Sequence, residues 1–392
     1  MIKTANIQRM SGLMIVIAIA LGLLSANTIY AELYFKVHHL RIHIGIEDFS
    51  LSRPLIDWIN EGLMVFFFLL VGLEIKKEIL EGQISKPSQI ALPAFSALGG
   101  MVLPAIIYAV FNWNDSVALQ GWAIPTATDI VLALGILSIL GTRIPSGLTV
   151  FLMAVAIFDD IVAVLIIGLF YGEQLSALPL FVAIGATILL FLINAYRMTG
   201  MWGYLIVGLV LWVALLESGV EASLAGIIIA LAVPMRSRPG GDLSPVRLLE
   251  KKIQPIVALA IVPLFAFLNA GIELDEPISD TLTAPIPLGI ILGLVIGKQF
   301  GIFGAALIAV GLGLGKLPAN VTWGQVYGAS LLAGIGFTMS LFVATLAFEE
   351  AGLVASAKVA VLTASLLSAV AGLAVLLMTT PRLRQLPTAK PG

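Results

Sequence analysis

Four ionisable side chains stand inside long apolar stretches of this sequence: Asp129, Asp159, Asp160 and Lys298. A charge at the centre of a lipid bilayer costs about 2.5–3.5 kcal/mol on insertion scales, so these side chains are expected to face one another or a water-filled cavity. The adjacent carboxylates of Asp159 and Asp160 offer oxygen ligands that suit a hard metal cation. Because the two carboxylates repel each other and burial disfavours charge, at least one of them should titrate near physiological pH.

A site of this kind can hold either protons or a metal cation, and competition between the two is sufficient for their exchange across a membrane. If two protons leave for each monovalent cation, every cycle also moves net charge. The alternative for Lys298 is a buried ion pair that only fixes helix packing. That alternative is weaker for the aspartates, because one lysine cannot neutralise both Asp159 and Asp160.

The elements that position these residues are predicted to be membrane-spanning helices. Of the 392 residues, 59% are hydrophobic and 11% are charged, and the mean hydropathy is +1.07, whereas soluble chains carry roughly 25% charged residues. Apolar runs of about 20 residues can cross a bilayer as helices. We expect an all-α polytopic membrane protein, in which residues 1–392 form a single integral membrane transporter domain with about twelve transmembrane helices, roughly 12–31, 55–80, 91–112, 121–140, 146–171, 177–197, 201–217, 219–235, 249–272, 285–313, 324–348 and 354–380.

The composition excludes several other kinds of site. The formal net charge of -2 gives no basis for nucleic-acid binding. There are no cysteines, and the three histidines, His38, His39 and His43, share one short loop, so neither a thiolate site nor a buried histidine metal site is expected. The sequence has no Walker A lysine motif. The energy for uphill transport would therefore come from an ion gradient, and no cofactor is expected.

Two segments have the composition of broken helices, residues 125–129 and residues 334–340, because each places helix breakers and hydroxyl groups in mid-span. Non-helical backbone at that depth is tolerated only where it is buried in protein or lines a cavity. If the two discontinuous helices cross, Asp129 can offset the facing positive helix ends and Lys298 the negative ones. For Gly334 and Gly336 alone, close helix packing is an equal alternative.

The order of these features repeats along the chain. The third to fifth predicted spans hold a broken helix and then the aspartate pair, and the tenth to twelfth hold Lys298 and then the second broken helix. The two groups are offset by an odd number of spans, so they would have opposite orientations in the membrane. This order predicts inverted repeats at about 91–171 and 285–380, with the binding site where they meet.

The distribution of lysine and arginine predicts that both termini are cytoplasmic. Of the 21 such residues, only Lys36, Arg41, Arg53 and Lys358 would lie on the outer side, and Lys298 lies inside a span. An uncleaved first helix fits this count better than a cleaved signal peptide does.

One long outer loop has the alternation typical of a β-hairpin. Isoleucines alternate with histidine and glycine over residues 42–46, which predicts a hairpin over about 39–52 that turns near Glu47 and Asp48. A lone hairpin is marginal in water, so pairing with a second copy would stabilise it. A homodimer contact is predicted here, with a loop packed on its own helices as the alternative.

Several of these stretches resemble the NhaA-type sodium/proton antiporter family. They are residues 121–130, 151–160 and 296–298 around the charged positions, with further matches at 68–74, 263–271 and 334–341. The matches follow the family's order through almost the whole chain. The resemblance implies electrogenic exchange of sodium or lithium for protons, a role in pH and sodium homeostasis, a place in the bacterial inner membrane, and a homodimer joined through the hairpin.

The resemblance also implies roles for single residues. Asp160 would be the main cation ligand, with Asp159 as its partner in binding the metal ion and protons. Asp159 would serve either as a second proton carrier or as the salt-bridge partner of Lys298. Thr128 and Asp129 would support the cation and proton site, and Asp129 and Lys298 would compensate the charges of the helix ends.

A further group of residues, Glu74, Lys77, Glu78 and Glu250, matches the family's cytoplasmic pH-response region, and the alternative is an ordinary solvated ion-pair network. Lys251, Gln254 and Glu221 stand where histidines occur in some relatives. Histidine titrates near neutral pH and these residue types ordinarily do not, so a shifted pH profile with retained exchange is expected.

Two other function classes fit the residues less well. An intramembrane aspartyl protease also uses two aspartates, but these come from different helices and share one proton, whereas Asp159 and Asp160 are adjacent and Lys298 would have no role. A passive cation channel would need a continuous polar pore, and the polar residues here cluster near mid-membrane.

Overall fold

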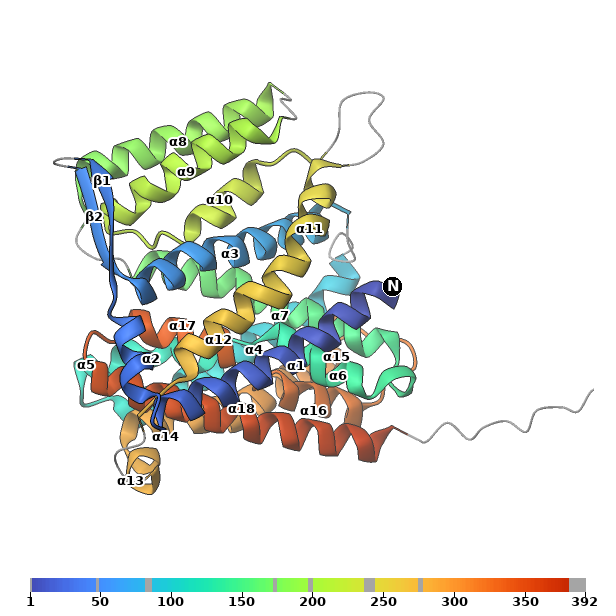
Figure 1. The fold of residues 1–392 in the computed structure, drawn as a ribbon. Helices are drawn as coiled ribbons and strands as arrows, with labels where there is room; N and C mark the ends of the chain where they lie inside the picture. The colour runs from blue at the N-terminus through green and yellow to red at the C-terminus, as the bar shows by residue number, and fades with distance from the viewer. Residues whose placement is uncertain are drawn as a thin grey trace, which may run out of the picture.

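The computed structural model describes residues 2–46, 49–81, 87–171, 175–196, 200–235, 244–273 and 278–380, which are mostly helical (Figure 1). The first part of the chain contains α1 (Ile2–Ala26), α2 (Ala31–His38), β1 (Arg41–Ile46), β2 (Phe49–Pro54), α3 (Leu55–Glu81), α4 (Pro87–Asn112), α5 (Ser116–Leu119), η2 (Gln120–Thr126), α6 (Ile130–Ile139), η3 (Gly141–Arg143) and α7 (Ser146–Phe170). The second part contains α8 (Ala177–Ala195), α9 (Met201–Ser218), α10 (Leu224–Ala232), α11 (Pro245–Ile256), η4 (Val257–Ile261), α12 (Val262–Ala270), α13 (Ile278–Thr283), α14 (Pro285–Leu292), η5 (Gly293–Gly297), α15 (Lys298–Gly311), α16 (Trp323–Leu332), α17 (Phe337–Ala347) and α18 (Ala351–Thr379).

Many of these helices are long and apolar enough to cross a membrane. Within the described residues there are nine such segments, or ten if α16 and α17, bent by 43° relative to each other, are taken as one. The sequence predicted about twelve. Two predicted spans, 55–80 and 219–235, are not among these segments. The first corresponds to α3, which has 27 residues. The second contains α10, which has only 9 residues and is too short to cross a bilayer alone.

The predicted hairpin forms a two-stranded antiparallel sheet, in which Arg41 of β1 pairs with Pro54 of β2 and Ile46 pairs with Phe49. Its predicted turn residues, Glu47 and Asp48, lie outside the described residues. In Figure 1 the hairpin stands at one end of the bundle, beside the ends of α8 and α9. We call this end the outer end, after the predicted orientation.

The helices pack around two apolar cores that share α3. Met64, Phe67 and Phe68 of α3 belong to a large core with α1, α4, α6, α7, α12 and α14–α18. Val65 and Leu69 project from another face of α3 into a smaller core with α8, α9 and α10. Figure 1 shows α8–α10 along one side of the molecule and α4, α7 and α15–α18 on the other. The chain thus forms two helical groups with α3 between them.

Small residues allow the helices that carry the candidate site to approach closely. A Cβ atom on Gly99 of α4 would overlap the carbonyl of Gly301 in α15 and lie 2.6 Å from the Cβ of Ala305. Contacts of this kind are common between membrane helices. Apolar side chains are surrounded by apolar lipid already, so the attraction between the helices comes from close van der Waals packing. The approach of α4 to α15 fixes the position of Lys298 at the start of α15.

Helix α2 docks on the outer end through Tyr34 and His38. The Tyr34 hydroxyl donates to the carbonyl of Phe267, 2.7 Å away, and His38 is buried. Burial, followed by the charges of Lys358 and His39, lowers the pKa of His38 to about 4. The neutral imidazole is therefore the form that the folded protein favours.

Substituting Gly99 by valine should separate α4 from α15 and lower the melting temperature of the detergent-solubilised protein. Overpacking of this kind costs about 1–3 kcal/mol. The matched control is Gly185→Val in α8, where a Cβ meets nothing within 4 Å. Equal melting temperatures for the two variants would contradict the close packing.

The position of His38 predicts a pH dependence of stability. Its pKa in the folded protein, about 4, lies below the ordinary value of 6.5, so its contribution is fully present above pH 6.5 and is lost as the pH falls through about 4. In His38→Gln the decline in melting temperature over this window should be shallower. His43→Gln, at an exposed position, should follow the parent protein, and an unchanged decline in His38→Gln would refute the assignment.

Candidate functional site

The ionisable residues singled out in the sequence meet where two helical pairs are interrupted. η2 ends at Thr126 and α6 begins at Ile130, while α16 ends at Leu332 and α17 begins at Phe337. The backbone amide of Asp129 donates a hydrogen bond of 2.6 Å to the carbonyl of Ile335. The two interruptions are therefore in direct contact.

The carboxylate of Asp129 bridges the first turns of two helices. One oxygen accepts from the backbone amide of Leu132 in α6 at 3.0 Å. The other accepts from the amide and the hydroxyl of Thr338 in α17, at 3.1 and 2.6 Å. The unpaired amides of a first helical turn carry partial positive charge. One buried carboxylate thus faces the positive ends of both α6 and α17.

Asp159 and Lys298 form an ion pair, and both side chains have no exposed surface. Lys298 follows directly on the π-helical turn η5, and such turns occur frequently at functional sites. Thr128 lies between the interruption and the pair: its hydroxyl is 2.7 Å from Asp159 Oδ2 and 2.8 Å from the carbonyl of Ala333. The structure therefore brings Thr128, Asp159 and Lys298 together.

The two aspartates of α7 have different surroundings. Asp159 Oδ2 interacts with Lys298 and Thr128, whereas its Oδ1 is buried without a partner among the described residues. Asp160 is 5% exposed, and within the described part of the chain its carboxylate has no hydrogen-bond or ion-pair partner. Buried polar atoms are normally satisfied, so these oxygens are available to a proton or to a cation.

The residues predicted to respond to pH lie near the opposite end of α3 from the hairpin. Lys77 forms an ion pair with Glu250 of α11, and Glu74 lies within electrostatic range of Lys77, Glu78 and Glu250. Two further contacts join the same elements: Arg247 pairs with Glu81, and Lys76 donates to the carbonyls of Leu231 and Val233. This end of α3 is thus tied to both α10 and α11.

Lys251, Gln254 and Glu221, the three positions that the resemblance compares with histidines, do not all lie together. Lys251 and Gln254 are on α11, near the ion pairs of α3. Glu221 follows α9 and lines a cavity at the outer end instead. The predicted topology separates them in the same way, because Glu221 stands at the outer end of the eighth predicted span and Lys251 at the inner end of the ninth.

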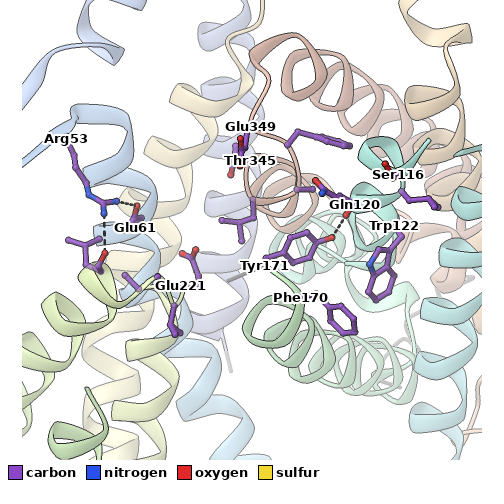
Figure 2. A pocket seen from close by; sticks show the side chains of 18 residues that line it. Arg53, Glu61, Ser116, Gln120, Trp122, Phe170, Tyr171, Glu221, Thr345 and Glu349 are labelled. Carbon is purple, nitrogen blue, oxygen red and sulfur yellow. Dashed lines mark hydrogen bonds and ion pairs between the residues drawn. The ribbon is translucent and has the colours of Figure 1, made fainter. Parts of the chain in front are cut away.

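The outer cavity has a volume of about 830 Å³ and lies between the two helical groups (Figure 2). On one wall, Arg53 donates to Glu61 at 2.8 Å and to the carbonyl of Leu216 at 3.2 Å. On the other wall, the Tyr171 hydroxyl donates to the carbonyl of Gln120 at 2.6 Å. The aspartate pair is not among the residues that line this cavity.

Sequence reasoning missed two polar contacts. Thr338 lies in the predicted broken helix, but the sequence analysis did not pair its hydroxyl with Asp129. Lys358, predicted to be on the outer side, donates to Asn269 at 3.3 Å, and Asn269 donates to Asn60 at 2.8 Å. Pairing the polar residues of apolar helices by depth would have been a signal for both.

The fold and the site define a polytopic α-helical membrane protein with buried ionisable side chains at the meeting point of two interrupted helical pairs. The chain belongs to the family described as Na+/H+ antiporter 1, because the model of that family matches residues 3–376. The resemblance found in the sequence is thereby confirmed, and the family consists of transporters rather than enzymes.

Relatives from several bacteria match over nearly their full lengths. The chain is 49% identical to the Na(+)/H(+) antiporter NhaA 2 of Saccharophagus degradans, over 93% of this chain and 96% of the relative. It is 47% identical to the Na(+)/H(+) antiporter NhaA of Bordetella parapertussis, over 95% of each chain. It is 45% identical to the NhaA 2 protein of Magnetococcus marinus, over 95% of this chain and 96% of that relative.

Replacing one partner of the buried ion pair should destabilise the protein more than replacing both partners. Lys298→Met leaves Asp159 without its cation, and breaking a buried pair typically costs about 3–5 kcal/mol. In Lys298→Met/Asp159→Asn no uncompensated charge remains, so part of the loss should be recovered. Melting temperatures in detergent measure both effects, with Lys252→Met at an exposed site as the control. A double variant no more stable than the single one would argue against the pairing.

Proposed function

We propose that the protein is an electrogenic antiporter that exports sodium or lithium in exchange for protons at the Asp159–Asp160 pair. The observation that carries this proposal is the buried Asp160 carboxylate, which has no hydrogen-bond partner among the described residues and stands beside the Asp159–Lys298 pair. The names of the relatives, all Na(+)/H(+) antiporters, support the choice of sodium and protons. The physiological role would be pH and sodium homeostasis in the bacterial inner membrane.

The proposed exchange rests on competition for carboxylate oxygens. In the proton-loaded state Asp160 is neutral, which removes the cost of an unpaired charge in a low-dielectric site. When Asp160 loses its proton, its oxygens and the free Oδ1 of Asp159 can replace part of the hydration shell of an alkali cation. Protons and the cation therefore exclude each other, and a proton gradient can drive the cation outward.

The electrogenic step needs two protons for each monovalent cation. Asp160 supplies one. Asp159 supplies the second if it is protonated in the cation-free state. If Asp159 instead stays with Lys298, the second proton comes from another group. The contact of Asp159 with Thr128 supports a role for Asp159 as the second proton carrier. The Thr128 hydroxyl can donate to the Asp159 carboxylate or, instead, to the carbonyl of Ala333.

We further propose that α5–η2–α6 and α16–α17 are two broken spans that cross within inverted repeats at about 91–171 and 285–380. The backbone contact between Asp129 and Ile335 supports the crossing. Twelve spans with both termini in the cytoplasm would complete the topology, since an even number of crossings returns the chain to its starting side.

The ends of α3 supply two further proposals. At the inner end, Glu74, Lys77, Glu78 and Glu250 would respond to pH, and the Lys77–Glu250 ion pair between α3 and α11 supports a coupled network. At the outer end, β1 and β2 form a sheet of two strands. Its open edges favour pairing with a second copy in a homodimer.

Replacing Asp160 by asparagine should abolish exchange, because an amide neither releases a proton at physiological pH nor supplies a negative charge to a cation. The measurement is sodium-induced dequenching of a pH-sensitive dye in everted membrane vesicles. Asp280→Asn, at an exposed outer position, is the matched control and should retain exchange. Dequenching of normal amplitude in inserted Asp160→Asn would remove the central hypothesis.

A further inference from the structure

A second cavity, of about 630 Å³, lies at the inner end of the bundle. Its walls are the beginning of α4, one face of α7, and the segment from Gly313 to Ala319 that joins α15 to α16. Two glycines let this segment pack closely against α4 and α7: a Cβ on Gly315 would lie 2.9 Å from the Cβ of Leu92, and a Cβ on Gly147 would lie 2.8 Å from the Cβ of Pro318. We call this cavity the α7 groove.

The α7 groove is long, and most of the side chains that line it are apolar. On α7 it extends from Ser146 at the first turn to Phe158, past Val150, Phe151 and Ala154. Twelve residues of helix correspond to ~18 Å, and one leaflet of a bilayer contributes about half of the ~30 Å hydrocarbon core. The groove therefore has the length of a phospholipid acyl chain and begins at a helix end.

The mouth of the groove is positively charged. Lys316 lines it, is exposed, and takes part in none of the ion pairs of the described residues. The 25-residue helix α7 begins at Ser146, which also lines the groove. A helix N-terminus adds partial positive charge. Arg143, one turn before α7, is exposed at the same end. An anionic head group would complement these charges.

We propose that the α7 groove binds an anionic phospholipid, with the phosphate against Lys316 and the first turn of α7 and one acyl chain along the apolar wall toward Phe158. Basic pockets between helices at this depth suit anionic head groups. A zwitterionic lipid has the same acyl chains but places a second positive charge next to Lys316, so it binds less well.

The test uses phosphatidylglycerol with a photoactivatable diazirine in the acyl chain, incorporated into vesicles with the full-length protein. Mass spectrometry of peptides should locate the label on α7 between Val150 and Phe158. Lys316→Glu should lower this labelling at least about fivefold, since a single lysine near a lipid surface contributes an effect of that size. Val150→Trp should block labelling by filling the groove.

Three controls make the outcome decisive. Lys252→Glu reverses an exposed charge outside the groove, and Leu165→Trp enlarges a side chain on α7 that is 55% exposed and does not line the groove; both should label as the parent does. The corresponding phosphatidylcholine probe should label α7 less. Equal labelling by the two probes, unchanged labelling in Lys316→Glu, or a crosslink from α7 to a second protein copy instead of lipid would overturn the proposal.

Discussion

Lys298 and Asp159 form an ion pair inside apolar helices, and the low dielectric around the pair constrains everything near it. Each charge alone would cost several kcal/mol in such surroundings, and their mutual attraction offsets that cost only with good geometry. The helices that carry the two residues, α7 and α15, therefore have to stay in register. The close approach of Gly99 to Gly301 maintains this register from the side of α4.

The same constraint explains the interrupted helices. Breaking a helix in mid-span exposes amides and carbonyls that have no water to bond with. Asp129 accepts from the first turns of both α6 and α17, while its own amide donates to Ile335. Each interruption thus supplies hydrogen-bond partners for polar groups of the other. Asp160 is next to Asp159 of the ion pair, and its carboxylate has no hydrogen-bond or ion-pair partner among the described residues.

Much of the fold could be predicted from the sequence, because the bilayer restricts the choice of structure. Long apolar runs predicted helices, and the alternation over residues 42–46 predicted the hairpin strands. The span boundaries were less certain: the first predicted span, to residue 31, contains the end of α1 at Ala26 and a new helix from Ala31. Hydropathy does not distinguish one bent helix from two, since both bury the same side chains.

The sequence by itself determined which residues are costly to bury, and therefore that Asp129, Asp159, Asp160 and Lys298 would seek partners. Only the tertiary structure decided which of them have partners among the described residues, and which partners these are. Lys298 pairs with Asp159 and not Asp160 because neighbouring positions on a helix point about 100° apart, and the packing of α4 against α15 sets the direction from which the lysine arrives. Residue types set the free-energy cost of burying these charges, whereas long-range packing sets the geometry of the contacts that offset this cost.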